Sequence, residues 1–377
     1  MKLLRNDKLK DLTRPQQFAC LSQRLALELN SKTYIAVEQE REQVEGYMRL
    51  CLRVEDGSET MTTVSPSEPL LAEAASDAMR HFDTLLAMER VLSGYSIHQG
   101  DRGELLVMLL LTLARDATVY PVGSVKDVNP IVPTLELVEQ LFTKHSHIKA
   151  MKPTFSPDST SALNLGEMLA KSATHFNHFI KMQQQSFLTD KHLAGLLARG
   201  AFVLCATGQP GVDLIGTALR DKDKPISSDN IIIFLFQVKN DPRYTSTVDE
   251  ALFNVMDPFL LKIVSEGAKD VVVVRVVTAL GAMRPSTTPI RPRTGSREFT
   301  AYDIWCAGMS PEVYAPIKAN RADTWAALLN ASRGWEKLYN VNEPAAGLRR
   351  QEKAAASKNR DHWKQWWDIP TPVGSGS

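Results

Sequence analysis

Residues 231–240 read IIIFLFQVKN, and this apolar run with a polar end is the stretch that decides the fold. A short apolar run rich in isoleucine and phenylalanine is typical of a buried strand. Side chains two apart along a strand share a face. Gln237 and Lys239 are therefore expected to point one way, and Phe236 and Val238 the other way.

A second strand is predicted over residues 212–219, and it carries Asp213 near its beginning. If it pairs antiparallel with the first strand, Asp213 reaches the sheet edge where Gln237 and Lys239 lie. Upstream, the string Arg-Gly-Glu-Leu places Glu104 near the start of a predicted helix. The other predicted core elements surround these two strands: helix 101–117, strand 201–206, helix 248–266 divided at Pro258, and strand 271–277.

The order helix, three strands, helix, strand resembles the core of the PD-(D/E)XK nuclease superfamily. This resemblance implies an α/β fold with a restriction-endonuclease-like core, to which further helices are added. It also implies a divalent metal held by the Asp213 carboxylate and the Gln237 side-chain carbonyl, with Glu104 as an outer ligand or water-holder. Oxygen ligands suit Mg²⁺ or Mn²⁺. Lys239 would orient the attacking water and stabilise developing charge.

The sequence departs from the family pattern at two positions. Pro210 stands three residues before Asp213, whereas the family has proline and aspartate adjacent. Gln237 replaces the acid of the second element, which removes one negative charge but leaves an oxygen ligand. The first alternative is therefore a catalytically inactive nuclease-fold module that binds DNA or a protein. The second is an interaction domain whose strand motif is coincidental.

Each candidate residue also has an ordinary structural interpretation. Asp213 can be a turn residue after Pro210, and Lys239 can belong to an exposed strand end. Glu104 can be an acid favoured at a helix N-terminus by the helix dipole. The three structural interpretations are not independent. If the chain has a different fold, none of the three residues has the proposed functional role.

An arginine-bearing loop supplies the candidate nucleic-acid contacts. Residues 281–296 are rich in proline, threonine and arginine and predict an exposed loop. The cations in or beside it are Arg284, Arg291, Arg293 and Arg297. Such cations can contact phosphates, so we expect a nucleic-acid partner, DNA before RNA, with little sequence specificity. A solvated loop without a partner is the alternative.

Three strings carry a closer resemblance, to fungal proteins similar to Crinkler-type effectors and mobile-element-associated proteins. They are SPSEPLL at residues 65–71, RGEL at 102–105 and QVKN at 237–240. The resemblance covers roughly residues 40–335. In that group a nuclease-like domain follows an NTPase region. It implies that residues 1–65 are the edge of a missing upstream region, and that the protein acts in a host cell or nucleus.

The remaining chain divides into three predicted parts. Residues 1–65 predict a helix over 15–29 and a strand over 48–54, and residues 66–340 form the nuclease-like domain. A helical insertion over 121–199 is expected within it, where His175 and His178 would lie on a helix over 162–185 as a surface or half-buried pair. Residues 341–377 form a basic tail with three tryptophans and a terminal Gly-Ser linker. An amphipathic helix docked on the body, a nucleic-acid arm or a partner-binding helix are its alternatives.

Composition excludes several classes of protein. The 377 residues carry 44 basic and 43 acidic side chains, so the net charge of +1 gives no global attraction for nucleic acid. The four cysteines include no Cys-x-x-Cys pair, which argues against structural zinc and for a reducing compartment. The longest apolar run, residues 105–111, is far shorter than the roughly 20 residues of a spanning helix. We therefore expect an intracellular protein with no membrane partner; its oligomeric state is not predicted.

Overall fold

The computed structural model describes residues 11–27, 29–31, 34–54, 61–93, 99–121, 130–157, 162–184, 188–206, 208–293 and 297–330. Contacts group the chain into two compact units, Met1–Leu329 and Asn330–Ser377. The tail predicted over residues 341–377 lies outside the described residues. The domain boundaries predicted near residues 65 and 340 stay predictions.

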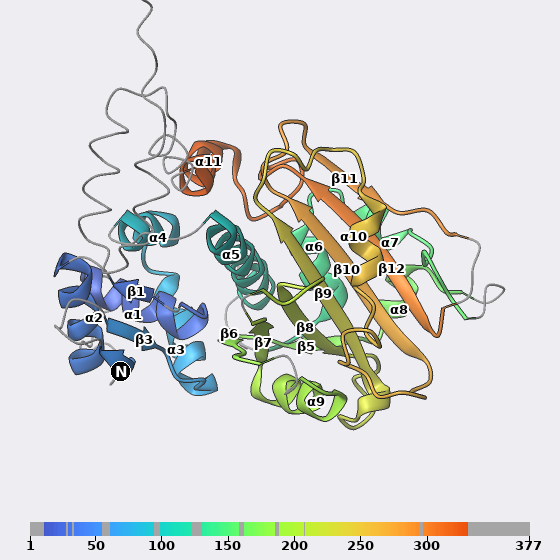
Figure 1. The fold of residues 1–377 in the computed structure, drawn as a ribbon, viewed down its shortest axis with the longest axis horizontal. Coiled ribbons are helices and arrows are strands. Elements are labelled where there is room, and N and C mark those ends of the chain that lie inside the picture. The colour runs from blue at the N-terminus through green and yellow to red at the C-terminus, as the bar shows by residue number, and fades with distance from the viewer. Residues whose placement is uncertain are drawn as a thin grey trace, which may run out of the picture. The chain divides into compact units, whose positions relative to one another are not determined.

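The first unit is a mixed α/β structure (Figure 1). Its helices are α1 (Arg14–Arg24), α2 (Tyr34–Gly46), α3 (Pro69–Met79), α4 (Thr84–Ser93), α5 (Gln99–Val119), α6 (Thr134–Leu141), α7 (His145–Lys149), α8 (Leu165–Leu169), α9 (Asp190–Arg199), α10 (Glu250–Val255) and α11 (Ala322–Asn330). Its strands are β1 (Leu29–Ser31), β2 (Leu50–Val54), β3 (Met61–Val64), β4 (Ile131–Pro133), β5 (Ala173–His175), β6 (His178–Lys181), β7 (Ala201–Leu204), β8 (Leu214–Leu219), β9 (Ile231–Lys239), β10 (Val271–Ala279), β11 (Ser286–Pro289) and β12 (Phe299–Ala307).

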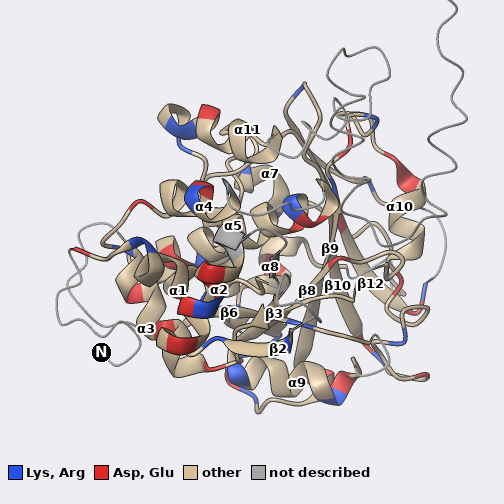
Figure 2. Cartoon of the chain, turned by 60° about the vertical axis from the view of Figure 1, so that its left-hand side comes forward, with Lys and Arg blue, Asp and Glu red and all other residues tan. Residues whose placement is uncertain are grey.

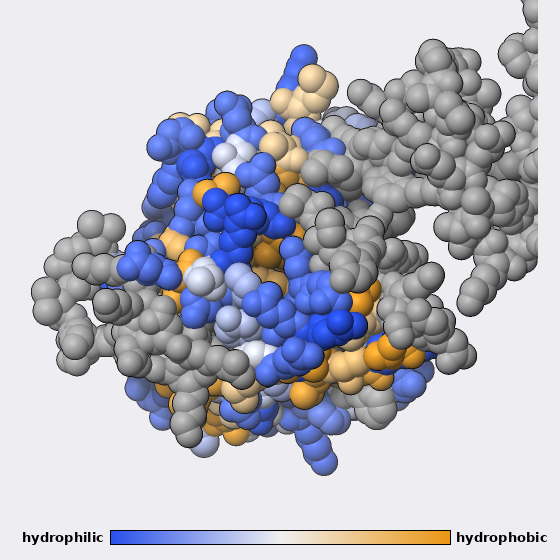
Figure 3. Space-filling view, turned by 90° about the vertical axis from the view of Figure 1, so that its left-hand side faces the viewer, coloured by the Kyte–Doolittle hydropathy of each residue, from blue (hydrophilic) through white to orange (hydrophobic). Residues whose placement is uncertain are grey.

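The N-terminal elements form a small layer of their own. Antiparallel strands in the order β1-β3-β2 accompany α1 to α4, and α1 packs against both α3 and α4. Figure 1 shows α5 between this layer and the large sheet. Buried Arg24 of α1 donates to Asp116 of α5, with its Nη2 2.8 Å from Oδ1, and so ties the layer to that helix. The face of this layer is largely hydrophilic with separate apolar patches (Figure 3).

The large sheet positions the candidate site. Its strands run in the order β11-β12-β10-β9-β8-β5-β4, and β7 pairs with both β6 and β8. Strand β8 is antiparallel to its neighbours β5, β7 and β9, whereas β9, β10 and β12 are parallel. The predicted strands over residues 201–206, 212–219, 231–238 and 271–277 are therefore confirmed. The restriction-endonuclease-like arrangement of this core is taken up under the proposed function.

Alternation along the central strands builds a core on each face of the sheet. Phe234 and Phe236 of β9 join the cluster that contains α5 and α6, while Leu235 joins the cluster that contains α10. Strand β10 behaves likewise, since Val274 belongs to the first cluster and Val273 to the second. Each fully buried valine contributes about 1.5–3 kcal/mol relative to an exposed one. Strand β10 is thus buried on both faces.

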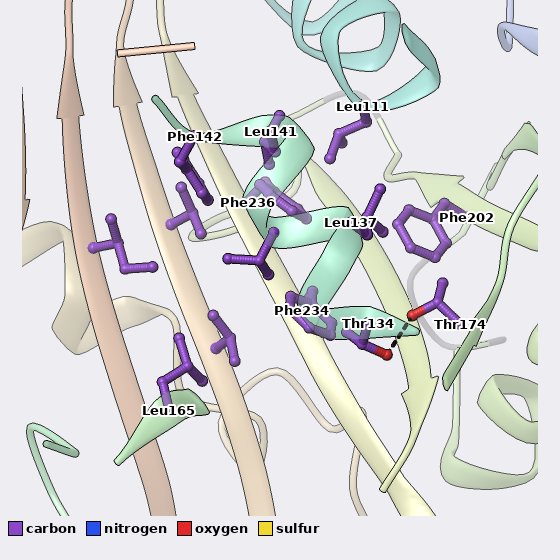
Figure 4. A pocket seen from close by; sticks show the side chains of 14 residues that line it. Leu111, Thr134, Leu137, Leu141, Phe142, Leu165, Thr174, Phe202, Phe234 and Phe236 are labelled. Atoms are coloured by element: carbon purple, nitrogen blue, oxygen red, sulfur yellow. Dashed lines mark hydrogen bonds between the residues drawn. The ribbon is translucent and has the colours of Figure 1, made fainter. Parts of the chain in front are cut away.

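An apolar cavity of about 30 Å³ lies under α6 (Figure 4). Its walls include Leu137, Phe202 and Phe236, and the Oγ1 atoms of Thr134 and Thr174 lie 2.9 Å apart at one end. A water needs about 10–15 Å³ and at least two polar partners. The cavity therefore has the size of a packing void in the core and is too small for a substrate.

Three predictions of secondary structure were wrong. Residues 162–185 do not form one helix but contain α8, β5 and β6, because short aromatic and β-branched stretches join the sheet. The predicted loop over 281–296 contains β11, which pairs antiparallel with β12. Of the helix predicted over 248–266, only α10 forms, because Asp257 caps a turn at Phe259 and Leu260.

The remaining helix predictions need smaller corrections. The helix predicted over residues 15–29 ends at Arg24. No helix within the described residues combines the length and apolar character that crossing a membrane requires.

Candidate functional site

Asp213 is fixed between two strands at the beginning of β8. Its backbone N–H donates to Phe236 O at 2.9 Å, and its carbonyl accepts from Cys205 N at 2.8 Å. Its Oδ2 atom accepts from Val238 N at 2.6 Å. The register pairs Leu214 with Phe236, so Asp213 lies beside the end of β9, as the sequence predicts.

Helix α5 lies so close to the end of β9 that a side chain at position 103 would collide with it. A Cβ atom on Gly103 would lie 2.9 Å from Asn240 Cβ and 3.1 Å from Val238 Cγ1. Asn240 Nδ2 donates to Gln99 O at 2.9 Å, and Gln99 Nε2 donates back to Asn240 O. The glycine of the Arg-Gly-Glu-Leu string therefore lets α5 rest on β9 and bring Glu104 to the site.

The two carboxylates influence each other through a partly buried environment. Burial, together with the negative charges of Asp213 and Asp101, raises the pKa of Glu104 to about 7 against the opposing charges of Lys181 and Lys239. Burial also raises the pKa of Asp213, while the Val238 N–H and the Lys239 charge oppose that rise. Charged carboxylates are thus disfavoured here until a positive charge compensates them.

Gln237 offers an oxygen that the protein itself does not use. Its side chain is only 5% exposed, and its Oε1 atom is buried with no hydrogen-bond partner. An unpaired buried oxygen costs about 1–3 kcal/mol, so this atom calls for a partner such as an ordered water, an ion or a ligand. The neighbouring Lys239 is half-buried, and its Nζ atom lies 5.7 Å from the centroid of the Tyr244 ring.

The donor set of Asp213, Glu104 and Gln237 fits a hard divalent cation. Carboxylate and amide oxygens are the ligands that Mg²⁺ and Mn²⁺ take in proteins. Within the described part of the chain, no group of three or more His, Cys, Asp or Glu residues could hold a metal. The two carboxylates would therefore need a further oxygen ligand, and the amide oxygen of Gln237 is the candidate for it.

Sequence reasoning missed Lys181, which lies at the end of β6. Strand β6 pairs in parallel with β7, and Lys181 lies opposite Leu204 in the register. Its charge lowers the pKa of Glu104, so Lys181 belongs to the electrostatic surroundings of the site. The run His-Phe-Ile-Lys at residues 178–181 was the available signal, since aromatic and β-branched residues favour a strand.

Cys205 is adjacent to these groups but stays protonated. Burial raises the pKa of its thiol, and the charges of Asp213 and Glu104 raise it further. A thiol kept protonated is a poor nucleophile. Cys205 is therefore a small residue of the core.

The four candidate arginines divide into two pairs. Arg293 Nη2 lies 2.5 Å from Glu250 Oε1, and Arg297 Nη1 lies 2.8 Å from Asp257 Oδ2. Arg284 and Arg291 are exposed. The first pair already binds carboxylates of the protein, so the second pair is the better placed for phosphates. Basic and acidic side chains are interspersed over the described helices that Figure 2 shows.

The two histidines are not a surface pair on a helix. His175 lies on β5 and His178 on β6. His178 is buried, its Nε2 lies 2.8 Å from Ser67 Oγ, and its Nδ1 lies 2.6 Å from Asn177 Oδ1. Burial, with the charge of Arg199, lowers the pKa of His178 to about 4. This residue ties the segment before α3 to β6.

Comparisons of the chain with protein-family models, curated proteins and solved structures found no match. The chemical interpretation of the candidate site therefore depends on its own residues. These are two carboxylates with raised pKa values, an unpartnered amide oxygen and a lysine, which lie at or near one end of the central strands β8 and β9.

Proposed function

We propose that this chain is a metal-dependent nuclease of the PD-(D/E)XK type, which hydrolyses phosphodiester bonds in nucleic acid. One observation carries the proposal. The charges of Glu104, Asp213 and Lys239 influence one another at the end of β9, where Asp213 lies next in register to Gln237 with its unpartnered oxygen. Titratable groups perturbed by burial and by a like charge are typical of functional sites.

The order of elements supports the same proposal. Helix α5 carries Glu104, the antiparallel strands β7, β8 and β9 carry the other residues, and β10 returns parallel to β9 after α10. This is the order expected of a restriction-endonuclease-like core, with β4 to β6 and α6 to α9 inserted between α5 and β7. A parallel return needs a crossover, which α10 and its flanking turns supply.

Each residue has a separate task in the proposed reaction. Asp213 and Gln237 would hold Mg²⁺ or Mn²⁺, and a bound ion of this kind supplies an activated water and neutralises charge on the phosphate. The Val238 N–H fixes the Asp213 carboxylate in position. Glu104 would accept a hydrogen bond from the attacking water. Lys239 would stabilise the negative charge that develops on the phosphoryl oxygens.

Plasmid cleavage in Mg²⁺ and in Mn²⁺ tests the proposal. Asp213→Ala and Lys239→Ala should each lower the cleavage rate by about 10²–10³-fold, because each removes charge stabilisation of the transition state. Asp223→Ala and Lys269→Ala are matched controls, since both residues are exposed and lie away from β9's end. Equal cleavage by all four variants would contradict the proposed site, provided that circular dichroism shows them folded.

A catalytically inactive module that binds nucleic acid is the second candidate. Gln237 favours it, because a neutral oxygen in place of an acid weakens the hold on a cation. This candidate predicts no cleavage by well-folded wild-type protein, together with DNA binding whose affinity falls steeply with salt. The intracellular or nuclear location expected from the sequence stays a prediction under both candidates.

A further inference from the structure

A serine, a histidine and an asparagine form a chain of hydrogen bonds where the segment before α3 meets β6. Ser67 Oγ lies 2.8 Å from His178 Nε2, and His178 Nδ1 lies 2.6 Å from Asn177 Oδ1. The serine and the histidine are 111 residues apart in the sequence, so folding brings them together. A hydroxyl, an imidazole and an orienting group in this order are the parts of a nucleophile that a general base activates.

The partners of Asn177 determine which nitrogen of the imidazole carries the proton. Asn177 Nδ2 donates to Glu73 Oε1 at 2.9 Å and to Pro69 O at 3.3 Å. Oδ1 is therefore the amide atom that faces His178, and it accepts from the Nδ1–H of the ring. A neutral imidazole with its proton on Nδ1 has an acceptor at Nε2. The hydroxyl of Ser67 is thus the donor in its bond to His178, as a serine nucleophile requires.

Arg199 places a positive charge beside the same hydroxyl. Its Nη2 donates to Ser67 O at 2.6 Å and lies 3.4 Å from Ser67 Oγ. Arg199 is exposed, and its guanidinium has further N–H donors without an acceptor in the described part of the chain. Such donors can bind the oxygen on which negative charge develops when a hydroxyl attacks a carbonyl group.

A cavity of about 260 Å³ opens beside Ser67. Ser67 is half-buried and lines the cavity, whereas His178 is buried. Leu52, Val64 and Ile180 also line it, and none of these three side chains is fully buried, so they are accessible apolar walls. Drug-sized ligands occupy pockets of roughly 300–1,000 Å³. This cavity therefore suits a smaller group, such as a short acyl chain.

We propose that Ser67, His178 and Asn177 form a second active site, which hydrolyses short-chain carboxylic esters and shares no residue with the proposed nuclease site. Ser67 Oγ attacks the carbonyl carbon, its proton passes to His178 Nε2, and the carbonyl electron pair moves to the oxygen, which Arg199 stabilises. When the carbonyl forms again, the bond to the alcohol breaks and the alcohol takes the proton from His178. A water molecule then attacks the acyl-serine in the same way, which releases the carboxylic acid and restores the serine.

The charge state of His178 is compatible with this role. Burial lowers its pKa to about 4, the charges of Arg199, Arg24 and His175 act in the same direction, and the charge of Glu73 opposes them. The imidazole is therefore neutral and able to accept a proton at roughly pH 6 to 8. A base of low pKa is a weak one, so turnover should be slow. Covalent capture of the serine is accordingly the more sensitive measurement.

A fluorophosphonate probe, from which the attacking serine displaces fluoride, tests the proposal in EDTA, which removes any contribution of the proposed metal site. Wild-type protein should be labelled at Ser67, as peptide mass spectrometry would show, and should hydrolyse p-nitrophenyl acetate. Ser67→Ala and His178→Gln should each lower labelling and hydrolysis by about 10²-fold or more, because each removes the base-activated nucleophile. Wild-type protein that is not labelled at Ser67 would overturn the proposal without any variant.

Another hydroxyl–histidine pair of the same chain provides the matched control. Thr189 Oγ1 lies 2.9 Å from His192 Nδ1, but the pair is exposed, its members are three residues apart, and no other described residue bonds the His192 ring. Thr189→Ala and His192→Gln should therefore react as wild type does. An equal loss in these controls would show that the measured hydrolysis comes from surface histidines, and would refute the second site.

Two further measurements separate a reactive serine from a structural one. Arg199→Met should lower the maximal rate of p-nitrophenyl acetate hydrolysis by about 10²-fold, with a smaller change in KM, because Arg199 acts on charge that develops in the transition state. p-Nitrophenyl octanoate should react more slowly than the acetate, since its chain exceeds the cavity. Labelling at Ser67 that His178→Gln leaves unchanged, with circular dichroism showing the variant folded, would overturn the role of the histidine as base.

Discussion

Two buried groups of charges in the same sheet have opposite character. On neighbouring strands β10 and β12, Arg275 and Asp303 lie opposite each other and form two hydrogen bonds, of 2.6 and 2.7 Å. Arg275 also donates to Phe253 O at 2.8 Å. At the end of β9, two carboxylates approach each other and the oxygen of Gln237 has no partner. The first group is complete within the chain, and the second is not.

The two groups differ in how far the chain itself compensates their buried charges. A buried ion is tolerable when a partner of opposite charge and hydrogen bonds compensate its lost hydration. Arg275 and Asp303 meet that condition, and so they need nothing from outside the protein. Glu104 and Asp213 meet it only in part, through Lys239 and the Val238 N–H. Their remaining charge is available for a cation.

Among the variants proposed here, Asp303→Asn should change the free energy of unfolding most. Asp303→Asn leaves Arg275 buried without its counter-charge, so the free energy of unfolding should fall by about 3–5 kcal/mol. Urea denaturation followed by circular dichroism measures this. The double variant Arg275→Met with Asp303→Leu should recover most of the loss, because a buried pair can be exchanged for apolar residues of similar volume.

The same substitution at Asp213 should have the opposite sign. Asp213→Asn removes a poorly compensated charge, and the new amide oxygen can still accept from Val238 N. In EDTA at pH 8 we expect the free energy of unfolding to rise, because burial raises the pKa of Asp213 and so disfavours its charged form. Destabilisation by both Asp303→Asn and Asp213→Asn would show that the two groups do not differ in character.

Gln237→Met tests the unpartnered oxygen directly, because it removes the amide and keeps a side chain of similar size. Removal of a buried, unsatisfied polar group should raise the free energy of unfolding by about 1–3 kcal/mol in EDTA. The stabilisation of wild-type protein by Mg²⁺ should disappear in the variant, since binding to the folded state raises stability by mass action. Thermal denaturation without Mg²⁺ and with roughly 10 mM Mg²⁺ would measure both effects. An unchanged Mg²⁺ shift would remove Gln237 from the metal site.

The sequence predicts the central strands and the placement of the candidate residues well. Periodicity along β9 requires Gln237 and Lys239 to share a face, and the antiparallel neighbour brings Asp213 to the same end. The Arg-Gly-Glu-Leu string marks the helix, and the structure adds the reason for its glycine. At Gly103 a side chain would collide with β9.

The same reasoning fails where tertiary contacts override local pattern. Residues 162–185 have apolar spacing compatible with a helix, yet β5 and β6 form because each joins a strand that is distant in sequence. Lys181 was missed for that reason. The hydrogen bond between Ser67 and His178 has no sequence signature either, because it joins residues that only folding brings together.

Glu104→Gln gives a small expected effect and the clearest sign. The folded-state pKa of Glu104, about 7, lies above the value of about 4.5 for an unperturbed glutamate. The folded state therefore binds this proton more tightly than the unfolded state does. Its contribution to stability is fully present below about pH 4.5 and is lost as the pH rises through 7.

Glutamine does not titrate, so Glu104→Gln should match wild type near pH 4.5 and be more stable at pH 8. After allowance for solvent screening, the difference should be roughly 1–2 kcal/mol. Urea denaturation in EDTA from pH 5 to pH 8 measures it, with exposed Glu266→Gln as the matched control. Parallel pH profiles for wild type and Glu104→Gln would show that Glu104 is an ordinary helix-terminal acid. Addition of Mg²⁺ should flatten the wild-type profile only if the cation compensates the Glu104 and Asp213 charges, which joins this test to the proposed site.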